Sequence, residues 1–102
     1  MKHVVVQLRA LRDLEDARAW YAEQAPHMTP GFASAVDEAL RHLKQQGATG
    51  SPKYGMQLGM TGLRSWPLSR FPYLVLSFDH NDRITVARVL HQARDIPAHL
   101  KN

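Results

Sequence analysis

Histidine offers this chain its widest choice of chemistry, because it can act as a base or as a metal ligand near neutral pH. The sequence has six: His3, His27, His42, His80, His91 and His99. No two of them have the HExxH spacing or another metal-ligand spacing, and the chain has no cysteine. The pattern therefore excludes disulfides and thiolate catalysis, and it predicts neither a metal site nor a cofactor.

Phosphate-binding glycine motifs are also absent from the sequence. Neither GxxxxGK[ST] nor GxGxxG occurs. Gly55, Gly59 and Gly62 are regularly spaced, but turns and bulges explain them better than phosphate binding does.

The segment from His91 to Asp95 concentrates the remaining reactive groups. We interpret His91 as a histidine at the end of a strand, whose ring bonds a nearby backbone group or carboxylate. We interpret Arg94 and Asp95 as an ion pair or a cap rather than a catalytic dyad.

A hairpin is the element that must position these residues. Two runs rich in β-branched and aromatic residues, 71–78 and 83–91, flank the polar cluster 79–82, which predicts two antiparallel strands. Both runs are apolar on both parities, so we expect both faces of the hairpin to be covered.

The first half of the chain predicts one strand and two helices. Residues 3–8 form a β-branched run, and residues 11–25 have helical periodicity, with Asp13 near the helix start, where the helix dipole favours anions. Thr29 is the expected N-cap of a second helix that Gly47 closes. We expect the two apolar stripes to be buried against each other and the sheet. Their residues are Leu14, Tyr21, Phe32, Val36, Leu40 and Leu43.

The second half adds strands after a loop. Residues 47–57 read as a loop, residues 58–66 as a strand with glycine interruptions, and residues 96–100 as a tail of uncertain form. The whole chain, residues 1–102, is expected to be one domain. Its predicted fold is α+β, in the order β-α-α-β-β-β, with a helical hairpin packed on a mainly antiparallel four-stranded sheet.

Charge is distributed unevenly along the sequence. Residues 1–40 carry four basic and six acidic side chains, whereas residues 41–102 carry nine basic and three acidic ones. This favours an anionic partner, either nucleic acid or an acidic polypeptide, over a basic protein that has no such partner. No apolar run approaches the roughly 20 residues that span a bilayer, and no secretory signal is indicated, so we expect a cytoplasmic protein without a membrane partner.

Five short motifs, in one consistent order, resemble a known family. They are Asp13-Leu14, Trp20-Tyr21, Gly62-Leu63-Arg64, Phe71-Pro72-Tyr73 and the closing segment from Val89 to Asp95 with its Leu-His-x-x-Arg-Asp signature. Over about residues 3–95, the chain resembles the ParE branch of the ParE/RelE toxin superfamily.

The resemblance implies a toxin of a type II toxin–antitoxin system that a cognate ParD-like antitoxin neutralises. ParE-type members are associated with inhibition of DNA gyrase, whereas RelE-type members cut mRNA on the ribosome. We expect the ParE-like activity, inhibition of gyrase by binding, with no catalytic residues and no sequence-specific nucleic-acid binding by the toxin alone. The alternatives are a RelE-like ribosome-dependent mRNA endonuclease and a homologue that only binds its antitoxin.

Site residues follow for the nuclease alternative. Metal-independent RNA cleavage needs a base for the 2′-hydroxyl proton and cations for the scissile phosphate. Arg64 matches the strand-two arginine of RelE-like enzymes, and Arg94 lies near the position of a second one. His91 or His99 would replace the C-terminal tyrosine of those enzymes, because no tyrosine follows Tyr73.

Five side chains are expected to bind the antitoxin. Trp20 and Tyr21 are adjacent on a helix, so they cannot both face the sheet, and one should meet a partner. Arg64 and Arg88 lie on predicted strands and suit an acidic antitoxin segment, together with Trp66.

Overall fold

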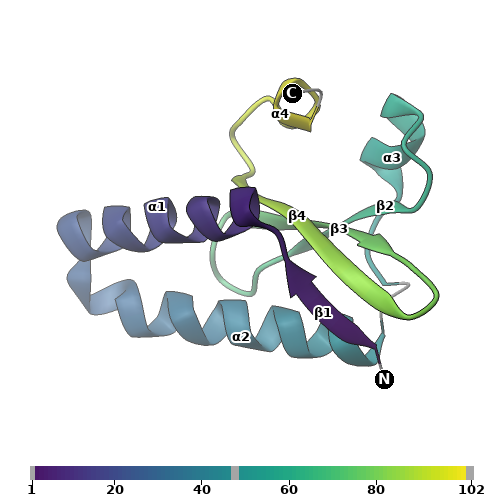
Figure 1. The fold of residues 1–102 in the computed structure, drawn as a ribbon. Coiled ribbons are helices and arrows are strands. Elements are labelled where there is room, and N and C mark those ends of the chain that lie inside the picture. Colours follow the sequence, from purple (N-terminus) through teal and green to yellow (C-terminus); the bar gives the residue numbers. More distant parts are fainter. Residues whose placement is uncertain (1, 47–48, 101–102) are drawn as a thin grey trace.

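The computed structural model describes residues 2–46 and 49–100 (Figure 1). Its centre is a four-stranded sheet in the order β1-β4-β3-β2, with β1 parallel to β4 and the other neighbours antiparallel. The strands are β1 (His3–Val6), β2 (Leu63–Pro67), β3 (Tyr73–Asp79) and β4 (Arg83–His91). The predicted α+β class, the sequence of the main elements and the mainly antiparallel sheet are confirmed.

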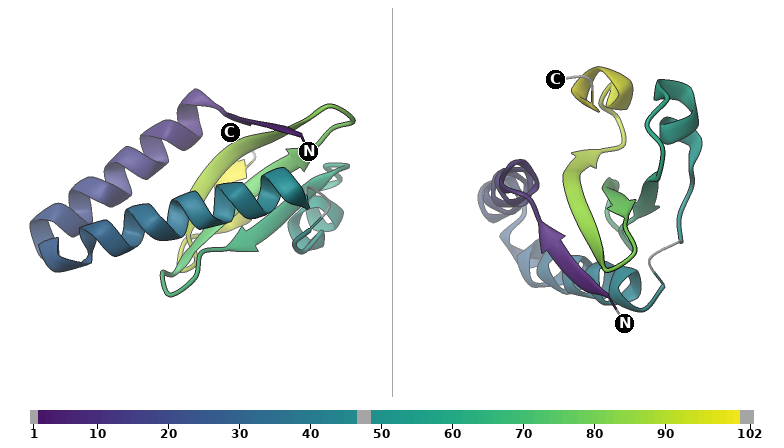
Figure 2. Two further views of the ribbon diagram at one scale, coloured as in Figure 1. Left: turned by 90° about the horizontal axis from the view of Figure 1, so that it is seen from below. Right: turned by 45° about the vertical axis from the view of Figure 1, so that its right-hand side comes forward.

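Helices lie on both faces of the sheet (Figures 1 and 2). The long helices α1 (Leu8–Gln24) and α2 (Thr29–Gln45), joined by the 3-10 turn η1 (Pro26–Met28), form the predicted helical hairpin on one face. The short helices α3 (Lys53–Leu58) and α4 (Ile96–Leu100) lie toward the other face. The central β3–β4 hairpin is therefore covered on both sides, as its composition predicts.

Helix α1 begins earlier than predicted. Strand β1 ends opposite Val86, and the backbone N–H of Gln7 donates to the Val86 carbonyl at 3.0 Å, so the helix starts at Leu8 rather than at residue 11. No acidic residue lies in its first turn. The predicted interaction of Asp13 with the helix dipole was therefore wrong, and Asp13 is left to face β4.

The expected caps of α2 also differ from the structure. Thr29 lies inside the helix, and the position before it, Met28, has no side-chain capping bond. Burial of the Thr29 hydroxyl leaves it without a hydrogen bond to any residue in the described ranges. The predicted Thr29 cap was wrong, and Gly47 lies outside the described residues.

Helix α3 is the element that the sequence did not indicate. The stretch taken as a loop and then a strand contains a helix that ends at Gly59 in the left-handed conformation (φ 67°), and β2 begins only at Leu63. Gly55 is buried inside α3, although glycine is a poor helix former. Glycine is needed at this position because a β-carbon there would lie 2.7 Å from the Leu63 carbonyl oxygen. Tertiary packing therefore overrides local propensity. Gly59 and Gly62 form turns, and the irregularity in the sheet lies between Leu76 and Ser77 instead.

The core beneath α1 and α2 is only partly the predicted one. Tyr21, Phe32 and Leu43 are buried, but Leu14, Val36 and Leu40 are half-buried. Alanines occupy several of the buried helix positions: Ala10, Ala17, Ala35 and Ala39. Because alanine lets a helix lie close to its neighbours, the larger side chains beside it remain partly open to solvent. Complete burial of the two stripes was therefore a wrong expectation.

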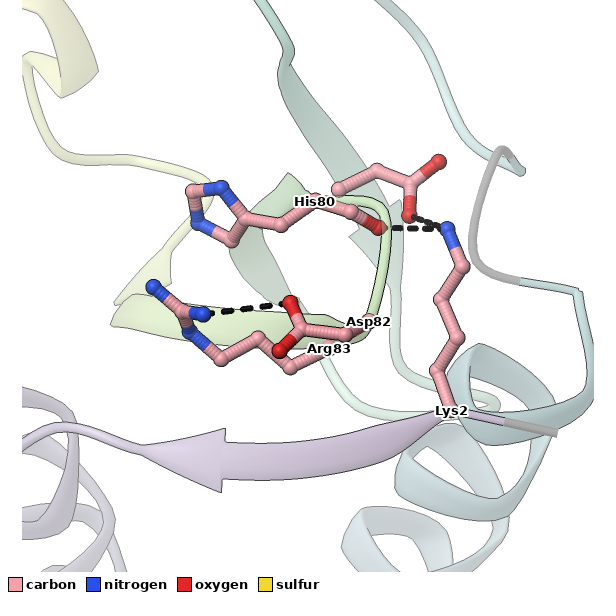
Figure 3. Close-up of polar contacts among 5 residues, drawn as sticks. Lys2, His80, Asp82 and Arg83 are labelled. Carbon is pink, nitrogen blue, oxygen red and sulfur yellow. Dashed lines mark hydrogen bonds and ion pairs between the residues drawn. The ribbon is translucent and has the colours of Figure 1, made fainter.

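The start of the chain is fastened to the β3–β4 turn (Figure 3). The Lys2 ammonium pairs with the Asp79 carboxylate and donates to the His80 carbonyl, while the Lys2 backbone N–H donates to the Lys44 carbonyl at 3.3 Å. Lys2 thus joins β1, α2 and the hairpin turn. The adjacent pair Arg83–Asp82 is more exposed to solvent.

Candidate functional site

Asp13 and Arg88 form an ion pair where the outer edge of β4 has no strand partner. Beyond Val86, β1 no longer covers this edge, and α1 passes beside it. The Asp13 carboxylate accepts from the Val89 backbone N–H at 2.9 Å and from Nε and Nη2 of Arg88 at 2.8 and 3.0 Å. The Asp13 carboxylate therefore accepts hydrogen bonds from both the unpaired backbone N–H of the β4 edge and the largely buried guanidinium.

The Arg88 guanidinium connects three elements. Its side chain is 12% exposed and that of Asp13 14%. The hydrogen bond that Arg88 donates to Asp13 raises the pKa of Arg88 above its ordinary value, with burial acting in the opposite direction. Arg88 Nη1 also donates to the His99 carbonyl of α4 at 3.3 Å. The pair thus holds α1 and α4 to the same strand.

A cavity of about 360 Å³ opens beside this pair, and we call it the β4-edge pocket. Its walls include Asp16 and Trp20 of α1, Tyr73 of β3, and His91 and Arg94 at the end of β4. The Tyr73 and His91 rings meet edge to face, with centroids 5.1 Å apart. Burial is the main cause of the raised pKa of Tyr73, and nearby Arg94 lowers that pKa.

The C-terminal groups of the signature have local structural partners. His91 Nδ1 accepts the Ala93 backbone N–H at 3.0 Å, which is the backbone bond that its interpretation predicted. The Asp95 carboxylate accepts the Ala98 N–H at 3.3 Å, in the first turn of α4. Asp95 is therefore a helix cap, one of the two roles that we expected for the Arg94-Asp95 step.

The nuclease candidates are not all brought together. His91 and Arg94 line the β4-edge pocket with Tyr73, whereas Arg64 lies opposite Ser77 and donates to the Gly50 carbonyl at 3.2 Å. Ser77 is four residues from Tyr73 along β3, or about 13 Å. Arg64 is thus at the other end of the strand from His91. The structure instead adds Tyr73, which the sequence reasoning had not included.

Trp20 is the most exposed of the three aromatic side chains that we expected to bind the antitoxin. Trp20 is 56% exposed, and its ring packs edge to face on that of Tyr21. Tyr21 is 6% exposed and contacts Phe32 and Phe71. Trp66 is half-buried and stacks on His42, with ring centroids 4.1 Å apart. The expected division between the adjacent residues is therefore present: Tyr21 faces the core and Trp20 faces solvent.

A second hollow surface lies between α1, α2 and β1, and we call it the interhelical groove. Its half-buried apolar residues are Val4, Val6, Leu14, Val36 and Leu40. It comprises cavities of about 410 Å³ and 180 Å³ that share Asp37. Sequence reasoning found its helical residues but assigned them to the core.

Across residues 2–46 and 49–100, no three histidine, aspartate or glutamate side chains are placed to hold a metal ion. In the same part of the chain, no helix has the length and hydropathy required to cross a bilayer.

The chain was compared with known protein families and with solved structures. Residues 4–96 match the family model of the ParE toxin of the type II toxin–antitoxin system parDE. A solved structure, the chromosomal ParDE toxin–antitoxin system from P. aeruginosa, superposes with a TM-score of 0.72 at 19% identity, over 89% of this chain and 96% of that chain. No curated protein sequence matches the chain.

Proposed function

This chain belongs to the ParE toxin family of type II toxin–antitoxin systems, and from that membership we propose that it inhibits DNA gyrase by binding and is neutralised by a cognate ParD-like antitoxin. It acts in the cytoplasm and contributes no catalytic residue of its own. The observation that carries the antitoxin part of the proposal is the interhelical groove.

The interhelical groove suits an amphipathic helix. Five half-buried apolar side chains from three elements form its floor, and such a surface usually marks a binding site. Cations near the floor are Arg18, Arg41 and Lys44, and the anions there are Glu15 and Asp37. This excess of cations over anions favours an antitoxin segment with acidic residues beside its apolar stripe. Attraction between the acidic residues and the cations would raise the association rate more than the final affinity.

The five side chains expected at the antitoxin interface would contribute in different ways. Trp20 offers exposed aromatic surface, and Arg64 and Trp66 are partly accessible on β2. Tyr21 and Arg88 already have internal partners, so they would act by holding Trp20 and the end of β4 in place. In this proposal the antitoxin wraps over the helical hairpin and continues toward the sheet.

Gyrase inhibition is tested directly with purified proteins. The toxin alone should inhibit supercoiling of relaxed plasmid by gyrase, and addition of the antitoxin encoded beside it should restore supercoiling. Unchanged supercoiling at a large molar excess of folded toxin would contradict the gyrase assignment. Failure of the neighbouring gene product to bind would contradict the antitoxin assignment separately.

A ribosome-dependent mRNA endonuclease is the second candidate, and one observation favours it. Tyr73, His91 and Arg94 line a single pocket, which supplies a phenol, an imidazole and a cation in place of the absent C-terminal tyrosine. Codon-specific cuts in mRNA on translating ribosomes that disappear in Tyr73→Phe and Arg94→Gln would establish this activity. Under the gyrase proposal, mRNA stays intact while supercoiling falls.

Val36→Asp should separate antitoxin binding from folding. Val36 is only half-buried, so a carboxylate there can reach water, and the protein should remain folded. In the bound complex the same carboxylate would be desolvated against an apolar, acidic segment. Antitoxin affinity should therefore fall about 30-fold or more, the scale of an interface hot spot.

The matched control is Met56→Asp, on the exposed surface of α3 and outside the groove. Affinity by calorimetry and melting by circular dichroism should be measured for both variants. Equal antitoxin affinity for the two folded variants would show that the interhelical groove is not the antitoxin site.

A further inference from the structure

The β4-edge pocket presents hydrogen-bond donors that no internal contact uses. The Arg94 side chain is exposed, and its guanidinium makes no ion pair or hydrogen bond with a residue in the described ranges. His91 Nδ1 accepts the Ala93 N–H, so the neutral ring carries its own proton on Nε2. Together with the Tyr73 hydroxyl, these groups can donate to the oxygens of an anion.

The acidic groups of the pocket do not cancel these donors. The Asp13 charge is balanced by Arg88, which contacts it through two nitrogens. Asp16 is exposed on α1 and has no cation bonded to it among the described residues. An unpaired carboxylate beside an anion-binding group is an acceptor for neutral hydroxyl or amino donors on the same ligand.

Trp20 gives the pocket a flat aromatic wall. It is 56% exposed and is held by the buried Tyr21 ring at a centroid distance of 5.1 Å and an interplanar angle of 90°. Rings held in this way are platforms on which any nucleobase can stack. A volume of about 360 Å³ also falls in the range of small-ligand sites, about 300–1,000 Å³.

From these features we propose that the β4-edge pocket binds a nucleoside monophosphate. The phosphate receives hydrogen bonds from Arg94, His91 and Tyr73, the base stacks on Trp20, and Asp16 accepts from the sugar hydroxyls. The pocket lies outside the interhelical groove, but it shares Trp20 with the antitoxin surface proposed above, so binding of this ligand is measured on the chain without its antitoxin.

Calorimetric titration of the folded chain with AMP, with inorganic phosphate and with adenosine tests the proposal. AMP should bind saturably, and phosphate or adenosine alone should bind at least about tenfold more weakly, because each makes only part of the contacts. Arg94→Gln should weaken AMP binding by about tenfold or more, and Trp20→Ala by about fivefold or more. Both side chains are exposed, so both variants should melt like the parent.

Arg41→Gln is the matched control, because it removes one exposed positive charge from α2 outside this pocket. Its AMP affinity should equal that of the parent. The proposal would be overturned if AMP showed no saturable binding up to about 10 mM. A dissociation constant above that concentration corresponds to a binding free energy weaker than about 3 kcal/mol. Equal losses in Arg94→Gln and Arg41→Gln, or phosphate binding as tight as AMP binding, would also overturn the proposal.

Discussion

Asp13→Ala should lower the free energy of unfolding by about 2–4 kcal/mol, because it leaves the largely buried Arg88 guanidinium without its counter-charge. The Val89 backbone N–H also loses its acceptor at the open edge of β4. Total stabilities of such domains are about 5–15 kcal/mol, so this is a large fraction. Urea denaturation followed by circular dichroism measures the change.

Two controls isolate the ion pair in that experiment. Asp16→Ala removes an exposed carboxylate from the same helix and should change stability by no more than about 0.5 kcal/mol. The double variant Asp13→Ala with Arg88→Met has no unpaired buried charge and should be more stable than Asp13→Ala alone. A cost below about 1 kcal/mol for Asp13→Ala would show that the pair does not hold α1 to the sheet.

Gly50→Ala should destabilise the protein by about 2–4 kcal/mol. Gly50 has φ 95°, and a β-carbon there would lie 2.6 Å from the Ser65 carbonyl oxygen. That carbonyl accepts the Ser51 N–H at 2.9 Å, and the Ser65 N–H donates back to Ser51 at 2.9 Å. Relief of the clash would separate this segment from β2 and break both bonds.

Gly62→Ala distinguishes the clash from backbone strain. Gly62 has a similar φ of 85°, but its β-carbon would come no closer than 3.9 Å to the nearest heavy atom, the Asp79 carbonyl oxygen. This variant should cost about 1 kcal/mol, the strain of a left-handed alanine. If thermal unfolding gave equal losses at both positions, strain alone would account for Gly50.

The sheet and the helical hairpin were predictable because their signals are long. The runs 71–78 and 83–91 are rich in β-branched and aromatic residues on either side of a polar turn, and the helical stripes repeat over several turns. Helix α3 has six residues and contains Gly55, so its local preference is weak. At Gly55 the helix lies directly against Leu63 and Met60, and that contact is not visible in a sequence.

The sites were harder to predict because each joins residues distant in the chain. Asp13 and Arg88 are 75 positions apart, and one sequence cannot show that they meet. A usable signal did exist, since an arginine in an otherwise apolar, two-sided strand needs a buried partner. For the interhelical groove, helical spacing identified Leu14, Val36 and Leu40 but not how far they are buried. That depends on how closely the alanine positions let the helices approach the sheet.

The parallel pairing of β1 with β4 constrains how the protein can be synthesised. His3 pairs with Arg83 and Val6 with Val86, so the first strand to leave the ribosome waits for the last strand of the sheet. At about 5–20 residues per second, that wait lasts several seconds. The helical hairpin, made of neighbouring segments, can form early, whereas sheet closure must follow translation of β4. During this interval the apolar inner faces of the helices and of the β2–β3 pair are open to chaperones and to aggregation.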